Sequence, residues 1–89
     1  MRAHKAERRA FKTDIAAKMD SLGRVAAGLV AARIVRDGTA PTWSELCSEM
    51  GWHCWWQRNL AVPKLAKAGW LVTGTASRSL RPGPKWNGS

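Results

Sequence analysis

The 89-residue sequence predicts one small domain that is mainly helical and carries a β-hairpin near its C-terminal end. Three observations predict this fold class. Apolar residues recur at spacings of three and four in several segments, as they do on amphipathic helices. Gly38, Gly51 and Gly69 each follow such a segment, at the position where glycine commonly ends a helix. After Gly69 the helical spacing stops, and short β-prone runs separated by a turn follow.

An alanine-rich, charged helix is expected over residues 2–20. Its apolar positions form a single stripe made of Phe11, Ile15, Met19 and Leu22. Residues 21–23 are expected to break or bend this helix. A second helix is expected over residues 24–36, and its apolar face consists of Val25, Leu29 and Ala32, widened by Val30 and Ile34. A face of that breadth favours burial on two sides.

The clearest local signal is the capping box in Thr42-Trp43-Ser44-Glu45. In such a box the Thr42 hydroxyl accepts a hydrogen bond from the Glu45 backbone, while the Glu45 carboxylate accepts one from the Thr42 backbone. The short helix that begins here is followed by a turn at residues 52–54 and by a longer helix over residues 55–68. Two helices joined in this way predict a helix-turn-helix.

Pro63 lies in the middle of the longer expected helix. A proline at such a position removes one backbone hydrogen bond and clashes with the preceding turn. The sequence therefore predicts either a kink near residues 59–62 or two short helices in succession.

Two short strands are expected after the last helix, at residues 70–73 and 78–81, with a turn between them. A hairpin directly behind a helix-turn-helix is a wing. Residues 82–89 contain two prolines and two glycines and are expected to be a flexible tail. The predicted architecture is a winged helix-turn-helix domain over residues 24–81, preceded by a basic N-terminal helix or arm over residues 1–23.

The charge of the chain is the first indication of function. Fifteen Lys and Arg residues against six Asp and Glu residues give a net charge of +9. Residues 52–89 contain six of the basic residues and none of the acidic ones. A field of this kind attracts polyanions, and nucleic acid is the commonest of these in a cell.

Several other classes of protein are not expected. The chain lacks the roughly 18 uncharged apolar residues of a membrane span, and its N-terminus lacks the pattern of a secretory signal, so a cytoplasmic, nucleoid-associated location is expected. Cys47 and Cys54 are too few for a disulfide scaffold and lack zinc-site spacing, and Cys47 is expected to be a small buried side chain. No acid/base pair indicates catalysis, so neither enzymatic activity nor a cofactor is predicted.

Residues 38–81 resemble the winged-helix DNA-binding domain at the N-terminus of LexA repressors. The matching landmarks are Ala40-Pro41-Thr42, Glu45-Leu46, Met50-Gly51-Trp52, Leu65-Ala66-Lys67-Ala68-Gly69 and residues 75–81. With residues 24–36 as the first helix of that fold, the resemblance covers residues 24–81. It implies sequence-specific binding of duplex DNA, with the helix that begins near Trp55 in the major groove and the wing along the phosphate backbone. The resemblance does not extend to the self-cleaving, dimerising domain of LexA repressors, so self-cleavage is not expected.

The resemblance puts the base-reading positions in the first two turns of that helix. They fall on Cys54, Trp56, Gln57, Asn59 and Leu60. The amides of Gln57 and Asn59 are suited to bidentate pairing with adenine. The side chains expected on the phosphate backbone are Thr42, Trp55, Arg58, Thr75, Ser77, Arg78 and Arg81. Arg78 and Arg81 have no acidic residue near them in the sequence, which favours phosphate contact, whereas Arg58 suits either guanine or phosphate.

The first functional hypothesis is a small duplex-DNA-binding protein that serves as a transcriptional repressor or a recombination accessory factor. The alternative is a protein-interaction module, because Trp55 and Trp56 are about 100° apart on a helix and at least one of them should be exposed. A third hypothesis is single-stranded nucleic acid stacking on these rings. The N-terminal helix is expected to follow DNA as a basic arm, to join two copies in a homodimer through its apolar stripe, or to pack that stripe on its own domain.

Overall fold

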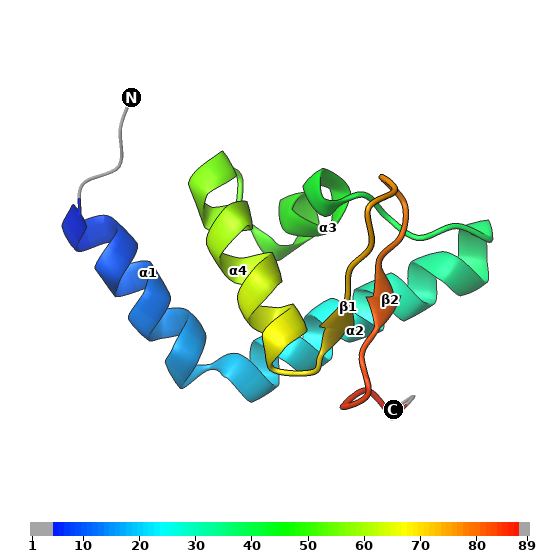
Figure 1. The fold of residues 1–89 in the computed structure, drawn as a ribbon, viewed down its shortest axis with the longest axis horizontal. Helices are drawn as coiled ribbons and strands as arrows, with labels where there is room; N and C mark the ends of the chain where they lie inside the picture. The colour runs from blue at the N-terminus through cyan, green and yellow to red at the C-terminus, as the bar shows by residue number, and fades with distance from the viewer. Residues whose placement is uncertain (1–4, 88–89) are drawn as a thin grey trace.

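The structure is a computed structural model, and it describes residues 5–87. Its elements in chain order are α1 (Lys5–Ala17), α2 (Met19–Asp37), α3 (Trp43–Met50), α4 (Trp55–Lys67), β1 (Leu71–Val72) and β2 (Arg81–Pro82). The helices surround one core, and the two short strands lie against α2 beside α4 (Figure 1). These elements confirm a mainly helical fold with a small antiparallel hairpin. Residues 1–4 and 88–89, which belong to the expected N-terminal helix and tail, lie outside the described residues.

The break between the first two helices lies earlier in the chain than the sequence predicts. It falls at Lys18, whose φ of −111° and ψ of 20° separate α1 from α2. Helix α2 then runs through Gly23, within the segment where the break was expected. Gly23 is buried, and a Cβ at this position would lie 2.2 Å from the Trp70 ring. The glycine therefore lets the tryptophan approach the helix closely, and it does not end a helix.

The face of α2 that enters the core also differs from the expected one. Its buried residues are Gly23, Ala26, Ala27 and Val30. Val25 and Ala32, from the expected face, are exposed instead. Small residues on the buried face let neighbouring elements come close, and those elements supply the large buried side chains Leu46, Leu65, Leu71 and Leu80. The apolar spacing predicted the helix correctly and its core face in part, since Val30 is buried and Leu29 and Ile34 pack against the core, whereas Val25 and Ala32 do not enter it.

Helix α3 begins and ends as the sequence predicts. The Thr42 hydroxyl accepts a hydrogen bond from the Glu45 backbone N–H at 3.1 Å, and the Glu45 carboxylate accepts one from the Thr42 backbone N–H at 2.9 Å. Gly51 ends the helix in the left-handed conformation, with a φ of 85°. The capping box is confirmed, and it fixes where the chain enters α3.

Helix α4 continues through Pro63 without interruption, so the predicted division into two helices is wrong. Pro63 itself is exposed. Its neighbours Ala61, Val62 and Leu65 are buried on the side of the helix that faces the core. Packing of this buried face supplies most of the stability of a helix in a folded protein, so it can hold α4 together across the missing N–H donor.

The hairpin is shorter in its strands and longer in its loop than predicted. β1 pairs antiparallel with β2, with Leu71 opposite Pro82 and Val72 opposite Arg81. The return strand therefore begins at Arg81 and not at residue 78, and we call residues 73–80 the hairpin loop. Leu80 is fully buried, so the end of the loop is drawn into the core before the strand can begin.

Residues 82–87 pack on the domain, so the prediction of a flexible tail is wrong for this segment. The Gly83 backbone N–H donates to the Trp70 carbonyl at 2.7 Å, and the Lys85 backbone N–H donates to the Gly69 carbonyl at 2.9 Å. Gly83 is buried, and a Cβ there would lie 2.3 Å from the Gly69 carbonyl oxygen. The glycine in this segment therefore serves a close backbone contact, which composition alone did not reveal.

Candidate nucleic-acid interface

An open groove lies between the start of α3, the first turn of α4 and the hairpin loop. It has a volume of about 550 Å³. Its walls are formed by Thr42, Trp43, Ser44, Arg58, Gly74, Thr75, Ala76 and Ser77. Three separate segments of the chain thus place four hydroxyl-bearing side chains and one guanidinium around the same space. Four of the residues predicted to contact the phosphate backbone, Thr42, Arg58, Thr75 and Ser77, meet here.

Arg58 crosses this groove from α4 to α3. Its Nη1 donates a hydrogen bond to the Ser44 hydroxyl. The side chain is half-buried, and among residues 5–87 it forms no ion pair. The positive charge of the groove is therefore not neutralised by a neighbouring carboxylate.

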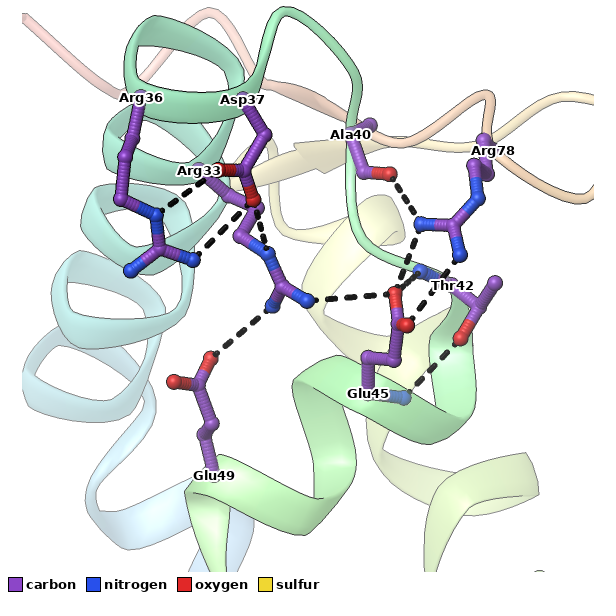
Figure 2. Close-up of polar contacts among 8 residues, drawn as sticks. All are labelled: Arg33, Arg36, Asp37, Ala40, Thr42, Glu45, Glu49 and Arg78. Atoms are coloured by element: carbon purple, nitrogen blue, oxygen red, sulfur yellow. Dashed lines mark hydrogen bonds and ion pairs between the residues drawn. The ribbon is translucent and has the colours of Figure 1, made fainter.

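Arg78 is engaged within the protein, in contrast to the sequence prediction that it has no acidic partner. Its guanidinium donates to the two carboxylate oxygens of Glu45 at 2.8 and 3.2 Å and to the Ala40 carbonyl at 3.1 Å (Figure 2). Glu45 is 33 residues away in the sequence, so only the fold brings the two together. Arg78 therefore fastens the hairpin loop to the beginning of α3, and its guanidinium, although 46% exposed, is already paired with Glu45.

The Glu45 carboxylate is the centre of a larger cluster of charges (Figure 2). Hydrogen bonds from Arg78 and from the Thr42 backbone, together with the positive charges of Arg78 and Arg33, lower the pKa of Glu45 to about 2. Arg33 lies 3.7 Å from Glu45 and also pairs with Asp37 at 2.8 Å and Glu49 at 3.9 Å. The cluster joins α2, α3 and the hairpin loop.

Arg81, the other basic residue predicted on the phosphate backbone, is exposed. Its Nη1 donates to the carbonyl of Leu80, the preceding residue, at 2.7 Å. Among the described residues Arg81 has no acidic partner. The two arginines at this end of the hairpin therefore differ in their surroundings, because Arg78 is paired and Arg81 is not.

The predicted base-reading residues differ in how accessible they are. Cys54 and Asn59 are exposed, whereas Trp56, Gln57 and Leu60 are half-buried. The side-chain oxygen of Gln57 accepts a hydrogen bond from the Cys54 backbone N–H at 3.2 Å, which caps the start of α4. Gln57 is therefore partly occupied within the protein, and Asn59 is the amide that remains open.

Helix α1 covers one flank of α4. The Phe11 ring meets the Trp56 ring edge to face, with the centroids 5.4 Å apart, and the Arg8 guanidinium lies 5.9 Å from the Trp56 ring centroid. The prediction that Trp56 contacts a base does not fit this packing. Trp55, one position earlier, is 63% exposed, so of the two adjacent tryptophans it is the more accessible one.

A second, smaller hollow lies between α1 and α4. It has a volume of about 190 Å³ and is lined by Arg8, Lys12, Trp55, Trp56, Asn59 and Leu60. Arg8 and Lys12 are not among the site residues predicted from the sequence. The signal was present, since the two are four positions apart on one side of a helix whose apolar stripe was recognised.

The Cys47 thiol is free and lies in the core. Burial raises the pKa of the Cys47 thiol to about 11, which agrees with its prediction as a small buried side chain. Within residues 5–87, no three His, Cys, Asp or Glu side chains come close enough together to hold a metal ion. The helices of the same part of the chain lack the combined length and hydropathy that crossing a membrane requires.

Comparison of the chain with family models, with curated proteins and with solved structures found no match.

Proposed function

We propose that this protein binds double-stranded DNA as a small winged helix-turn-helix protein. In this proposal α4 enters the major groove and the hairpin is the wing, which follows the phosphate backbone. The resemblance of residues 38–81 to LexA repressors supports it, as do the short connection between α3 and α4 and the hairpin behind them. The protein would act by occupying its site, as a transcriptional repressor or a recombination accessory factor close to the nucleoid.

The groove between α3 and the hairpin loop is the observation that carries the proposal. Hydroxyl groups and guanidinium groups are the donors that proteins commonly use to hold phosphate oxygens, and both line this groove. Arg58, with no carboxylate beside it, supplies the charge. A phosphate seated here would lie next to the exposed side of α4, so the helix would be held at the edge of the major groove.

Asn59 is the residue that we propose reads a base. Its amide is exposed near the middle of α4 and can pair with adenine through both its oxygen and its nitrogen. Gln57 would have to give up the hydrogen bond with the Cys54 backbone to do the same. Sequence preference should therefore depend on Asn59 more than on Gln57.

Fluorescence anisotropy with labelled duplexes tests the proposal. Binding to a random duplex should weaken steeply between about 50 and 200 mM salt, because phosphate contacts release counterions. Selection of bound duplexes should then yield a preferred sequence. Asn59→Ala should reduce discrimination at one position of that sequence by about 1–3 kcal/mol, with Gln57→Ala as the matched control. Duplex binding that is absent or insensitive to salt would contradict the proposal.

A second function is favoured by one observation, the 63% exposure of the Trp55 ring. Exposed tryptophans are common anchors of protein interfaces. An interface centred on Trp55 should respond little to salt, whereas phosphate-driven binding responds strongly, so the salt series separates the two functions. Competition between duplex and single-stranded DNA decides whether Trp55 stacks on unpaired bases instead.

A further inference from the structure

The role of α1 is the question that the sequence leaves open. Its apolar stripe is used inside the domain, because Ile15 is 1% exposed and Phe11 and Met19 pack against the core. Joining two copies through this stripe would require these side chains to leave the core. The exposed side chains of α1 include cations, carboxylates and alanines, and two of its cations, Arg8 and Lys12, line the smaller hollow beside α4.

The two concave regions lie on different sides of α4. Arg58 lines the groove beside the hairpin loop, whereas Asn59 and Leu60 line the hollow beside α1. Successive residues on a helix are about 100° apart, so Asn59 lies at the edge of the hollow that is nearer to Arg58, and Leu60 lies farther round the helix. A duplex that receives α4 in its major groove has one phosphate strand on each side of the helix.

The hollow beside α1 has the chemistry of such a strand. Arg8 and Lys12 have no acidic partner among residues 5–87. The Arg8 guanidinium lies 5.9 Å from the centroid of the Trp56 ring, and both side chains line the hollow. The exposed Trp55 ring offers an apolar surface beside these cations.

We propose that this hollow binds the second sugar–phosphate strand that borders the major groove. Phosphate oxygens accept hydrogen bonds from Arg8 and Lys12, and a deoxyribose rests on Trp55. The inference depends on the proposed duplex binding and adds to it that α1 is part of the interface. The two DNA strands then contact the protein on both sides of α4, and α1 enlarges the DNA-binding surface beyond the winged domain.

The test compares three variants of α1, each of which removes one positive charge. Arg8→Gln and Lys12→Gln alter the hollow, whereas Arg9→Gln alters the outer side of the helix, where Arg9 lies beside Ala6 and Thr13. The affinity of each full-length variant for a duplex is measured as a function of salt. The negative slope of log K against log salt should become less steep by roughly 0.9 for Lys12→Gln and for Arg8→Gln. It should stay at the wild-type value for Arg9→Gln, and sequence preference should be unchanged in all three.

The outcomes separate this inference from the proposed function. If the wild-type protein binds no duplex in a salt-dependent way, both proposals are overturned. If it does bind, but the slopes for Lys12→Gln and Arg8→Gln equal the wild-type slope, only the role of α1 is overturned. Equal losses in all three variants would indicate a general effect of charge and would also overturn it. Because Arg8 packs on Trp56, the thermal unfolding of Arg8→Gln is measured as a control of its folding. If Arg8→Gln is unfolded, the slope for Lys12→Gln alone decides the question.

Discussion

Arg78 and Arg81 are three positions apart, are chemically identical and are attached to the same hairpin, yet the fold gives them different tasks. Arg78 is bound to Glu45 by two hydrogen bonds, while Arg81 has no acidic partner in the described part of the chain. A residue's partners in space, and not its neighbours in the sequence, decide whether its charge is available to a ligand.

This difference predicts different effects on DNA binding. Arg81→Ala should make the salt dependence less steep by roughly 0.9 and leave thermal stability nearly unchanged, because it removes one of the proposed phosphate contacts from an exposed side chain. Arg78→Ala should lower thermal stability and weaken binding with a smaller change in slope, because it releases the hairpin loop. Salt-dependent anisotropy and circular dichroism measure both quantities. A loss of slope in Arg78→Ala at wild-type stability would show that Arg78 contacts phosphate itself.

The Glu45 carboxylate predicts a dependence of stability on pH. Its pKa falls from the ordinary 4.5 to about 2 in the folded protein, chiefly because Arg78 donates to it. A lowered folded-state pKa stabilises the fold above the unfolded-state value, and this contribution is lost as pH falls through the folded-state value. The difference in melting temperature between wild type and Glu45→Gln should therefore shrink between pH 4.5 and about 2.

Circular dichroism melts across that range measure the difference. Arg78→Gln removes the main cause of the lowered pKa, so it should narrow the pH range over which stability changes. A gap between wild type and Glu45→Gln that stays constant with pH would contradict the assignment.

At the scale of the element, α2 shows how a helix with few large residues can still be central. Its buried face consists of glycine and alanine with one valine, and the bulk is supplied by the strands and helices around it. Two glycines in α2 stand in contrasting surroundings. A Cβ at Gly23 would lie 2.2 Å from the Trp70 ring, whereas one at Gly28 would lie 3.4 Å from the Trp86 ring, which is an ordinary contact.

Gly23→Ala and Gly28→Ala should therefore change stability in opposite directions. Alanine is favoured over glycine in a helix by about 1 kcal/mol, so Gly28→Ala should stabilise by up to that amount. At Gly23 the clash with Trp70 should outweigh this gain, with an overpacking cost of about 1–3 kcal/mol or more. Urea unfolding gives both values. Equal gains at the two positions would mean that Trp70 does not press on Gly23.

The elements that the sequence predicted well are those specified by local interactions. The capping box at Thr42 and Glu45, the glycines after α2 and α3, and the spacing of Phe11 and Ile15 depend on residues within a few positions of one another. The elements predicted wrongly depend on partners far away in the chain. Gly23 was predicted to break a helix because the sequence pattern does not show that Trp70 packs against it. The same packing determines which face of α2 enters the core.

The same contrast between local and long-range interactions applies to the candidate site. Asn59, predicted from the resemblance to read a base, and Trp55, predicted on the phosphate backbone, are both exposed, and Thr75 and Ser77 line the groove, while their contacts with DNA stay predictions. The pairing of Arg78 with Glu45 and the covering of Trp56 by α1 required the tertiary fold. Charge counted along a sequence does not reveal which cations are neutralised by long-range partners.

At the scale of the whole molecule, the last described residues of the chain pack against an earlier segment. Residues 82–87 return to the junction of α4 and β1 through the backbone bonds of Gly83 and Lys85. The described chain ends on the side away from the hairpin loop, while α1 begins on the same side as the start of α4 (Figure 1). The proposed DNA-binding face is therefore free of the C-terminal segment.

Ending the chain after Pro82 should destabilise the fold and spare the DNA-binding residues. Two backbone hydrogen bonds to Gly69 and Trp70 are lost, which accounts for about 1–3 kcal/mol, and Trp86 no longer covers α2. Urea unfolding of the shortened chain measures the loss, and anisotropy below its melting temperature should show nearly the wild-type salt slope. Unchanged stability would mean that the C-terminal segment is not part of the folded unit.

The bond between Arg78 and Glu45 has a practical consequence for protein engineering. Residues 73–77 are held at one end by Val72 in the strand ladder and at the other by Arg78 on the start of α3. Both attachment points belong to the scaffold, so the residues between them can be replaced while the helices keep their places, except at Gly74, where a Cβ would lie 2.8 Å from the Ser79 side chain. Libraries randomised at these loop positions would change the contacts of the hairpin without changing the fold of the rest of the protein.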